Sequence, residues 1–113
     1  MQIGVLKETW PGEVRTSMVP ANVAKLVKTG FRIVIEKNAG EASGFADTAY
    51  EEAGARIESD RGAILGSSQV LLGVRKFELA ELDSIKKDTV CISFLDPYNE
   101  KQLVEAMATA GLT

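Results

Sequence analysis

The chain has 113 residues, of which 45% are hydrophobic and 26% are charged, and it carries a net charge of −3 at pH 7. These values are typical of one globular domain and exclude an intrinsically disordered chain. They also exclude nucleic-acid binding, which normally needs a basic stripe on the protein surface.

The cysteine and histidine content limits the chemistry further. The only cysteine, Cys91, lies in the apolar run Val90-Cys91-Ile92, and we expect it to be a small buried core residue in a reducing compartment. The chain has no histidine, which excludes a Ser-His-Asp or Cys-His catalytic arrangement within it. No apolar run approaches the roughly 20 residues of a membrane helix, and the N-terminus does not resemble a signal peptide. We therefore expect a cytoplasmic location.

The first part of the chain predicts two strands with a helix between them. Residues 3–6 predict the first strand, and residues 7–18 an irregular polar loop. Pro20 suits the first turn of a helix, and Gly30 is the natural stop of that helix. Residues 31–36 predict a second strand, whose apolar centre indicates a strand covered on both faces. The helix residues expected to face inward are Val23, Leu26 and Val27.

The middle of the chain predicts weaker elements. After a loop at residues 37–44, Asp47 is a plausible cap for a short helix that ends at Gly54. Its inward side chains are expected to be Tyr50 and Ala53. Arg56-Ile57 predicts only a brief extended piece, and residues 63–67 predict a helical turn.

The last part of the chain predicts two further strands and two helices. The strands are expected at residues 70–74 and 89–95, and a helix is expected between them at residues 78–86. A longer helix follows Pro97-Tyr98-Asn99 and ends at Gly111. The inward side chains are expected to be Leu79, Leu82 and Ile85 in the first helix and Leu103, Met107 and Ala110 in the second.

This alternation predicts an α/β fold, in which helices cover both faces of a parallel sheet joined by right-handed crossovers. The last helix should return the chain to a fifth parallel strand, and only two residues follow Gly111. We therefore expect a fragment of a longer protein, with an open sheet edge or an uncovered apolar face. The alternative is a complete four-stranded domain.

The glycines do not form a nucleotide-binding motif. No G-x-G-x-x-G follows a strand, and no G-x-x-x-x-G-K-[ST] is present. The glycines of residues 40–44 indicate only a loop. We therefore expect no cofactor-binding residues and no metal site within this chain.

Charged residues gather at the predicted carboxyl ends of the strands, where open parallel sheets bind ligands. Arg15 follows the first strand and could bind a carboxylate or phosphate by a two-pronged hydrogen bond. The alternative, which the composition favours, is a local pair with Glu8 or Glu13 that fixes the loop. Arg75-Lys76 follows the third strand and could extend such an anion site, or could belong to a solvated loop. Asp96, after the fourth strand, could be a turn or cap residue.

Several motifs together resemble one family. They are Ile3-Gly4-Val5-Leu6-Lys7-Glu8, Glu13-Val14-Arg15-Thr16, Val19-Pro20, Gly30-Phe31, Ala39-Gly40, Ala53-Gly54-Ala55 and Ile92-Ser93-Phe94-Leu95. This set resembles the alanine dehydrogenase and transhydrogenase alpha-subunit superfamily, over essentially the whole chain and in one register. The resemblance implies that residues 1–113 are a flavodoxin-like N-terminal domain. A separate Rossmann domain, which binds NAD(H), would be absent here.

The resemblance also bears on the reaction. In alanine dehydrogenases an arginine in the first loop binds the substrate carboxylate, and Arg15 matches it. A lysine after the third strand and a histidine after the fourth strand act on the substrate; here these positions carry Arg75 and Asp96. Gly73 and Phe77 also depart from the family's K-V-K-E-P pattern. Because an arginine does not readily give up its proton, alanine oxidation by the family mechanism is not expected.

The segment Ser93-Phe94-Leu95-Asp96-Pro97-Tyr98-Asn99-Glu100 instead resembles the transhydrogenase branch. This implies hydride transfer between NAD(H) and NADP(H), coupled to proton movement through a membrane partner that carries the NADP(H) site. The domain would shape the nucleotide cleft and support a homodimer, at the cytoplasmic face of the membrane, and would be inactive alone. The alternatives are an alanine dehydrogenase fragment and a stand-alone, non-enzymatic binding module.

Overall fold

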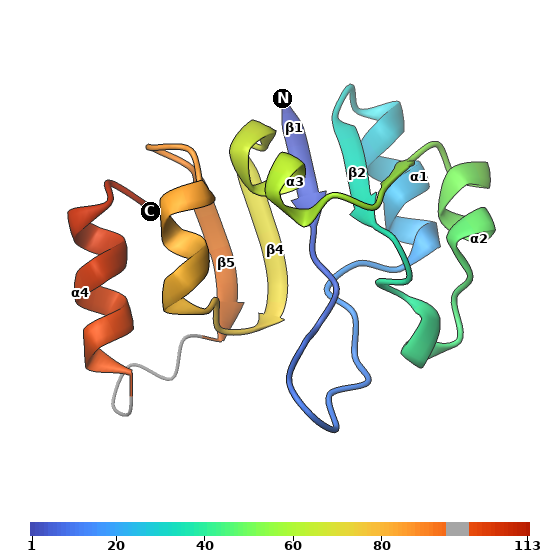
Figure 1. The fold of residues 1–113 in the computed structure, drawn as a ribbon. Helices are drawn as coiled ribbons and strands as arrows, with labels where there is room; N and C mark the ends of the chain where they lie inside the picture. The colour runs from blue at the N-terminus through green and yellow to red at the C-terminus, as the bar shows by residue number, and fades with distance from the viewer. Residues whose placement is uncertain (95–99) are drawn as a thin grey trace.

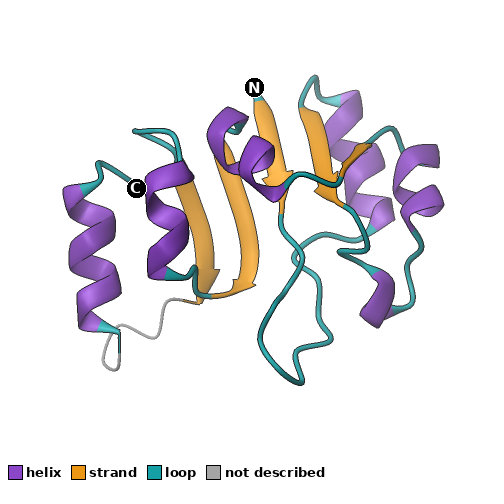
Figure 2. Cartoon of the chain, viewed as in Figure 1, coloured by secondary structure: helices purple, strands orange, loops and turns teal. Residues whose placement is uncertain are grey.

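The computed structural model describes residues 1–94 and 100–113. In this part of the chain, five parallel strands form one sheet in the order β3-β2-β1-β4-β5, with helices on both sides (Figures 1 and 2). The strands are β1 (Gln2–Val5), β2 (Arg32–Glu36), β3 (Arg56–Glu58), β4 (Val70–Arg75) and β5 (Val90–Phe94). The α/β architecture predicted from the sequence is confirmed.

The number of strands differs from the prediction. The segment expected to be a brief extended piece is β3, which pairs in parallel with β2 through Val34↔Arg56, Ile35↔Ile57 and Glu36↔Glu58. The four-stranded sheet expected from the sequence was therefore wrong. Charged residues flank Ile57, as is common in short edge strands, so β3 lacks the apolar run that marks a central strand.

The helices connect these strands in alternation. They are α1 (Pro20–Lys28), the 3₁₀ helix η1 (Glu41–Ser43), α2 (Asp47–Glu52), α3 (Arg61–Ser67), the 3₁₀ helix η2 (Leu79–Ser84) and α4 (Lys101–Thr109). Pro20 opens α1 as predicted, since its missing N–H has no helical partner at that position. Gly30 follows α1 with a φ of 103°, a left-handed conformation that glycine adopts without steric cost.

The predicted role of Asp47 as a helix cap was wrong. Asp47 is the first residue of α2, and the cap position is held by Ala46 without a side-chain hydrogen bond. The Asp47 carboxylate instead accepts the Asn38 N–H at 2.9 Å. Asn38 has a φ of 66°, so Asp47 stabilises a tight turn after β2 rather than the start of its own helix.

The segment after β4 also differs from the prediction. It is a 3₁₀ helix, shorter than the expected helix over residues 78–86, and a reciprocal capping box between Glu78 and Glu81 opens it. Leu82 and Ile85 are buried, whereas Leu79 is 44% exposed, so its predicted inward orientation was wrong. Leu79 shares the three-residue spacing of Leu82 and Ile85, but it is the first residue of the 3₁₀ helix, so the period alone does not decide its burial.

Two hydrophobic cores lie on opposite faces of the sheet. One contains α1 and α2 side chains, including Val23 and Tyr50, packed on Val5 and Ile35. The other contains side chains of α3, η2 and α4, packed on Val34 and Leu71. The alternation of strand side chains between these cores follows from the pleat of the sheet. Leu103 and Met107 are buried as predicted.

The outer strand β5 leaves apolar surface uncovered. Ile92 is 56% exposed and Phe94 is 72% exposed, and both line a cavity of about 280 Å³ together with Leu72. Thr113 lies along the outer edge of β5, since its N–H donates to the Thr89 carbonyl at 3.0 Å and its carbonyl accepts the Cys91 N–H at 2.7 Å. Ile92 and Phe94 therefore form an uncovered apolar face beside β5.

Cys91 is half-buried rather than fully buried, and it packs against the core that contains η2 and α4. Partial burial raises the pKa of the Cys91 thiol to about 11, because a thiolate would lose hydration there. None of the helices in residues 1–94 and 100–113 combines the length and apolar character needed to span a bilayer.

Candidate functional site

The candidate site lies where the strand order reverses. From β1 the sheet extends through β2 to β3 on one side, and through β4 to β5 on the other. The connections that leave the carboxyl ends of β1 and β4 therefore run toward opposite faces and open a crevice between them. The first of these connections carries Glu8, Glu13 and Arg15, and the second begins at Arg75.

Glu8 joins these two strand ends directly. Its carboxylate accepts the backbone N–H of Val74 at 2.9 Å and of Arg75 at 2.7 Å. These amides lie where the pairing between β4 and β5 shifts register. Glu8 therefore satisfies backbone donors at an irregular strand end and fixes the first loop to β4.

Glu13 brings together both arginines predicted as anion ligands. Its carboxylate binds the Arg15 guanidinium in a two-pronged contact, at 2.8 Å from Nε and 2.7 Å from Nη2. The same carboxylate accepts the Arg15 backbone N–H at 3.0 Å and the Arg75 Nε–H at 2.8 Å. The local pairing of Arg15 with an acidic loop residue is thus present, with Glu13 as its partner.

This cluster shifts the titration of its members. The pKa of the Glu13 carboxyl lies far below its ordinary range, first because of hydrogen bonds from the Arg15 side chain and backbone, and further because of the Arg75 side chain. The pKa of the Arg15 guanidinium is raised by its hydrogen bond to Glu13 and by the negative charge there. Both shifts favour the charged forms, so the cluster remains an ion network at neutral pH.

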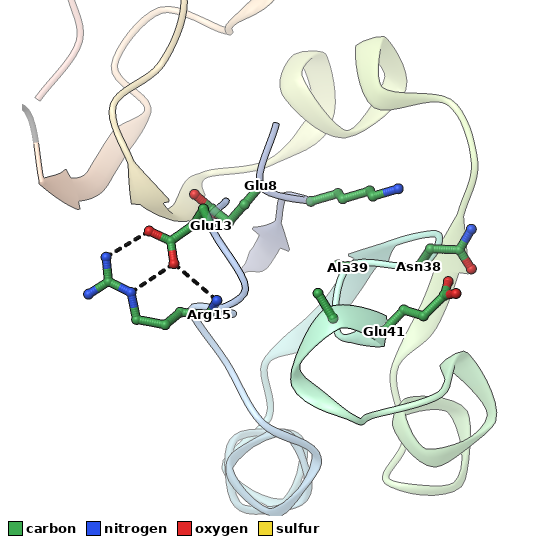
Figure 3. Close-up of a pocket in the computed structure, with 8 residues that line it drawn as sticks. Glu8, Glu13, Arg15, Asn38, Ala39 and Glu41 are labelled. Atoms are coloured by element: carbon green, nitrogen blue, oxygen red, sulfur yellow. Dashed lines mark hydrogen bonds and ion pairs between the residues drawn. The ribbon is translucent and has the colours of Figure 1, made fainter. Parts of the chain in front are cut away.

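A polar cavity of about 370 Å³ lies beside this network (Figure 3). It is open to solvent, and its walls come from the first loop and from the turn after β2. The lining residues are Lys7, Glu8, Glu13, Arg15, Asn38, Ala39, Glu41 and Ala42. The cavity is therefore polar and of a size for a small polar molecule rather than for a large apolar one.

A second ion network supports the base of the loop and was not predicted from the sequence. Arg61, at the start of α3, donates to Glu36 at 2.6 Å, to Glu81 at 2.5 Å and to the Lys7 carbonyl at 2.9 Å. The Lys7 N–H in turn donates to Glu36 at 2.7 Å. The three side chains come from α3, β2 and η2, and no local spacing in the sequence indicates that they meet.

The remaining predicted site residues lie apart from the Glu13 cluster. Lys76 pairs with Glu100, and its amine lies 4.9 Å from the centre of the Trp10 ring, so it does not extend an anion site with Arg15. Asp96 lies outside the described residues. Among the described residues, no group of histidine, cysteine, aspartate or glutamate side chains could hold a metal ion.

The start of α1 lacks the features of a dinucleotide cradle. In nucleotide-binding α/β domains the pyrophosphate lies at the N-terminus of the first helix, held by backbone N–H groups and approached through glycines. Here α1 begins at Pro20, which has no N–H, and Val19 precedes it without a capping hydrogen bond. A long loop, rather than a tight glycine turn, joins β1 to α1.

Comparisons with known proteins agree on one family. The family described as "Alanine dehydrogenase/PNT, N-terminal domain" matches residues 4–113. Alanine dehydrogenase 1 of Staphylococcus aureus (strain Mu50 / ATCC 700699) is 34% identical over 113 residues, which cover 100% of this chain and 30% of that protein. The chain thus spans less than a third of the length of this relative.

Solved structures show the same relationship. The crystal structure of transhydrogenase from Sinorhizobium meliloti is similar with a TM-score of 0.93 and 35% identity, covering 100% of this chain and 33% of that one. A structure of L-alanine dehydrogenase is similar with a TM-score of 0.94 and 34% identity, covering 100% of this chain and 31% of that one. The match over nearly the whole chain, in sequence and in fold, shows that this protein belongs to the alanine dehydrogenase/PNT N-terminal domain family of oxidoreductases.

Proposed function

We propose that this chain is the N-terminal domain of the NAD(H)-binding alpha subunit of a proton-translocating NAD(P) transhydrogenase. In this role it shapes one wall of a nucleotide cleft and supports a homodimer. The observation that carries the proposal is the residue at the end of β4, which is an arginine, Arg75, hydrogen-bonded to Glu13. A guanidinium does not readily donate a proton, and the 113 residues contain no histidine.

The absence of a dinucleotide cradle at the start of α1 supports a division of work between domains. NAD(H) would be held by a Rossmann domain, and when bound it would supply the hydride. The residues described here would hold the loop after β1 in place through Glu8, Glu13 and Arg61, and so position one side of the cleft. NADP(H) would bind on a membrane-associated partner, with this chain at the cytoplasmic face.

A second function, as part of an alanine dehydrogenase, is favoured by one specific observation. Arg15 lines a cavity of about 370 Å³ between the loop after β1 and the turn after β2, where a carboxylate could reach it. In this case pyruvate or alanine would bind next to Arg15 and Arg75 in the complete enzyme.

Activity measurements on the complete protein that carries this domain separate the two functions. With its NADP(H)-binding partner present, we expect NADPH-dependent reduction of an NAD⁺ analogue, followed by absorbance. We expect no NADH formation from alanine and NAD⁺. Alanine-dependent NADH formation that is lost in Arg15→Ala would contradict the transhydrogenase assignment and support the second function.

A further inference from the structure

A second cavity, of about 520 Å³, lies at the amino ends of the strands, at the top of Figure 1 and opposite to the loop between β1 and α1. It forms because β3 is shorter than β2. Pairing between these strands begins at Val34↔Arg56, so Arg32 and Ile33, the first residues of β2, precede the start of β3. The turns that follow α1 and α2 supply the other walls of this cavity.

Two arginines line this cavity from neighbouring strands. Arg56 lies opposite Val34 in register, and Val34 comes two residues after Arg32, so these three side chains leave the same face of the sheet. Arg32 and Arg56 are therefore diagonal neighbours on adjacent strands. Two side chains of this length can reach a common ligand from such positions.

Both guanidinium groups lack a partner within the protein. Throughout residues 1–94 and 100–113, the side chains of Arg32 and Arg56 make no ion pair and no hydrogen bond, whereas Arg15, Arg61 and Arg75 are each bound to a glutamate. The described residues that line the cavity include no acidic side chain. An anion that enters it therefore meets two free cations and no competing carboxylate.

The arginines are not needed to cap the helices that end beside the cavity. At the end of α1 the Gly30 N–H donates to the Val27 carbonyl at 3.0 Å, and after α2 the Ala55 N–H donates to the Tyr50 carbonyl at 3.0 Å. Backbone amides thus satisfy carbonyl groups at both helix ends. The two guanidinium groups keep all their donors for a ligand.

The wall beside the arginines is apolar. It includes Val27 at the end of α1, Phe31 in the turn that follows, and Ile33 in β2. Ile33 is buried, and Val27 and Phe31 are half-buried. A ligand that carried an apolar body on its anionic group would place that body against these side chains.

We propose that the cavity between Arg32 and Arg56 binds a phosphate monoester that carries a small apolar body. A phosphate monoester is close to a dianion at neutral pH and offers three acceptor oxygens, so one such group can bind both guanidinium groups. A carboxylate has only two oxygens, which one guanidinium fork occupies. This site lies at the end of the sheet opposite to the Arg15 cluster, and it does not depend on the transhydrogenase assignment.

Titration of ¹⁵N-labelled protein with phenyl phosphate, followed by amide NMR signals, tests the proposal. We expect saturable shifts at Ile33 and Gly54, which line this cavity, and unchanged signals at Asn38 and Ala42, which line the cavity beside Arg15. The absence of saturation at concentrations on the order of 10 mM, which corresponds to very weak binding, would overturn the proposal. Shifts centred on Asn38 and Ala42 would also overturn it.

Variants assign the binding to the two cations. Arg32→Gln and Arg56→Gln should each weaken phenyl phosphate binding at least about tenfold, because each removes one charged fork. Lys101→Gln is the matched control, since it removes one exposed cation from α4, which lies on the opposite side of the molecule (Figure 1). Its effect should stay below about twofold, because salt screens distant exposed charges. Equal losses in all three variants would reduce the effect to overall charge and contradict a site.

Two further probes test the ligand class. Inorganic phosphate lacks the apolar body and benzoate replaces the phosphate by a carboxylate, so each should bind at least about fivefold more weakly than phenyl phosphate. Inorganic phosphate that binds as tightly as phenyl phosphate would show that the apolar wall takes no part. Benzoate that binds as tightly would refute the preference for phosphate.

Discussion

The Tyr50 hydroxyl donates a hydrogen bond of 2.8 Å to the Met18 carbonyl and so joins α2 to the end of the loop that carries Arg15. The tyrosine is fully buried, and burial raises the pKa of its hydroxyl. Gly40 lies against the same ring, since a Cβ atom there would come within 2.5 Å of the Tyr50 hydroxyl. The contact therefore links α2 to the first loop and to the turn after β2, and residues of that loop and that turn line the cavity.

Tyr50→Phe should lower the free energy of unfolding by about 1–2 kcal/mol, because it leaves the buried Met18 carbonyl without this donor. Urea denaturation followed by circular dichroism measures the change, and the slope of the transition should stay constant. A variant as stable as the wild type would show that Met18 finds another donor, such as water.

Arg61→Met should destabilise the protein by about 2 kcal/mol, because it leaves Glu36 and Glu81 close together without their shared cation. Arg56→Met is the matched control, since Arg56 is an exposed residue of the edge strand β3. Thermal unfolding of both variants separates the loss of this network from the loss of one positive charge. Equal melting temperatures for the two variants would argue against the network.

Gly4→Ala should destabilise the protein by about 2–3 kcal/mol through overpacking. The added Cβ would lie 2.5 Å from Ser68 Oγ and 2.6 Å from Ile64 Cγ2, which is too close without movement of α3. Gly66→Ala is the control, because its nearest neighbour would be the Ser84 carbonyl oxygen at 3.6 Å. In helix α3 that change should be neutral or stabilising by up to about 1 kcal/mol, as measured by denaturant unfolding.

The stability contributed by the ionised Glu13 should depend on pH. Its pKa in the folded protein lies below the ordinary value of 4.5, so this contribution is complete above pH 4.5 and is lost as the pH falls further toward the folded pKa. The difference in unfolding free energy between wild type and Glu13→Gln should therefore shrink from about pH 5 to about pH 2. A difference that stays constant over this range would mean that Glu13 is not bound to arginine in solution.

Phe94→Ser should reduce self-association without a large loss of stability, because Phe94 is 72% exposed on the uncovered apolar face. Size-exclusion chromatography over a range of concentrations measures the association. Val14→Ser is the control, since Val14 is 57% exposed in the first loop, apart from this face. Unchanged elution of Phe94→Ser, or an equal shift in Val14→Ser, would exclude this face as the contact surface.

Much of the fold could be predicted from the sequence because local signals and tertiary packing agree. Pro20 and Gly30 mark the ends of α1, and the apolar centres of β2 and β4 mark strands covered on both faces. The strand β3 could not be predicted, because three residues with charged ends carry no clear period. Asp47 fits a helix cap locally, yet its carboxylate binds the amide of Asn38, which comes from a preceding turn.

The candidate site could be predicted only in part. From the sequence, the carboxyl ends of the predicted strands indicated that Arg15 and Arg75 lie near each other. The composition of the first loop also favoured a local pair of Arg15 with Glu8 or Glu13. The sequence did not indicate that one carboxylate binds both arginines, because Glu13 and Arg75 are 62 residues apart in the chain. The Arg61 network joins residues 25 and 20 positions apart. Such contacts arise from the sheet order, which a single sequence does not fix.

The central position of β1 has a consequence for synthesis on the ribosome. This strand emerges before the other four strands of the sheet, and it can pair with β2 once residues 32–35 follow. Its other edge remains unpaired until residues 70–72 of β4 have been made. A nascent chain therefore exposes one edge of β1, at the centre of the future sheet, until β4 has been made. During this interval chaperone binding would compete with misassembly.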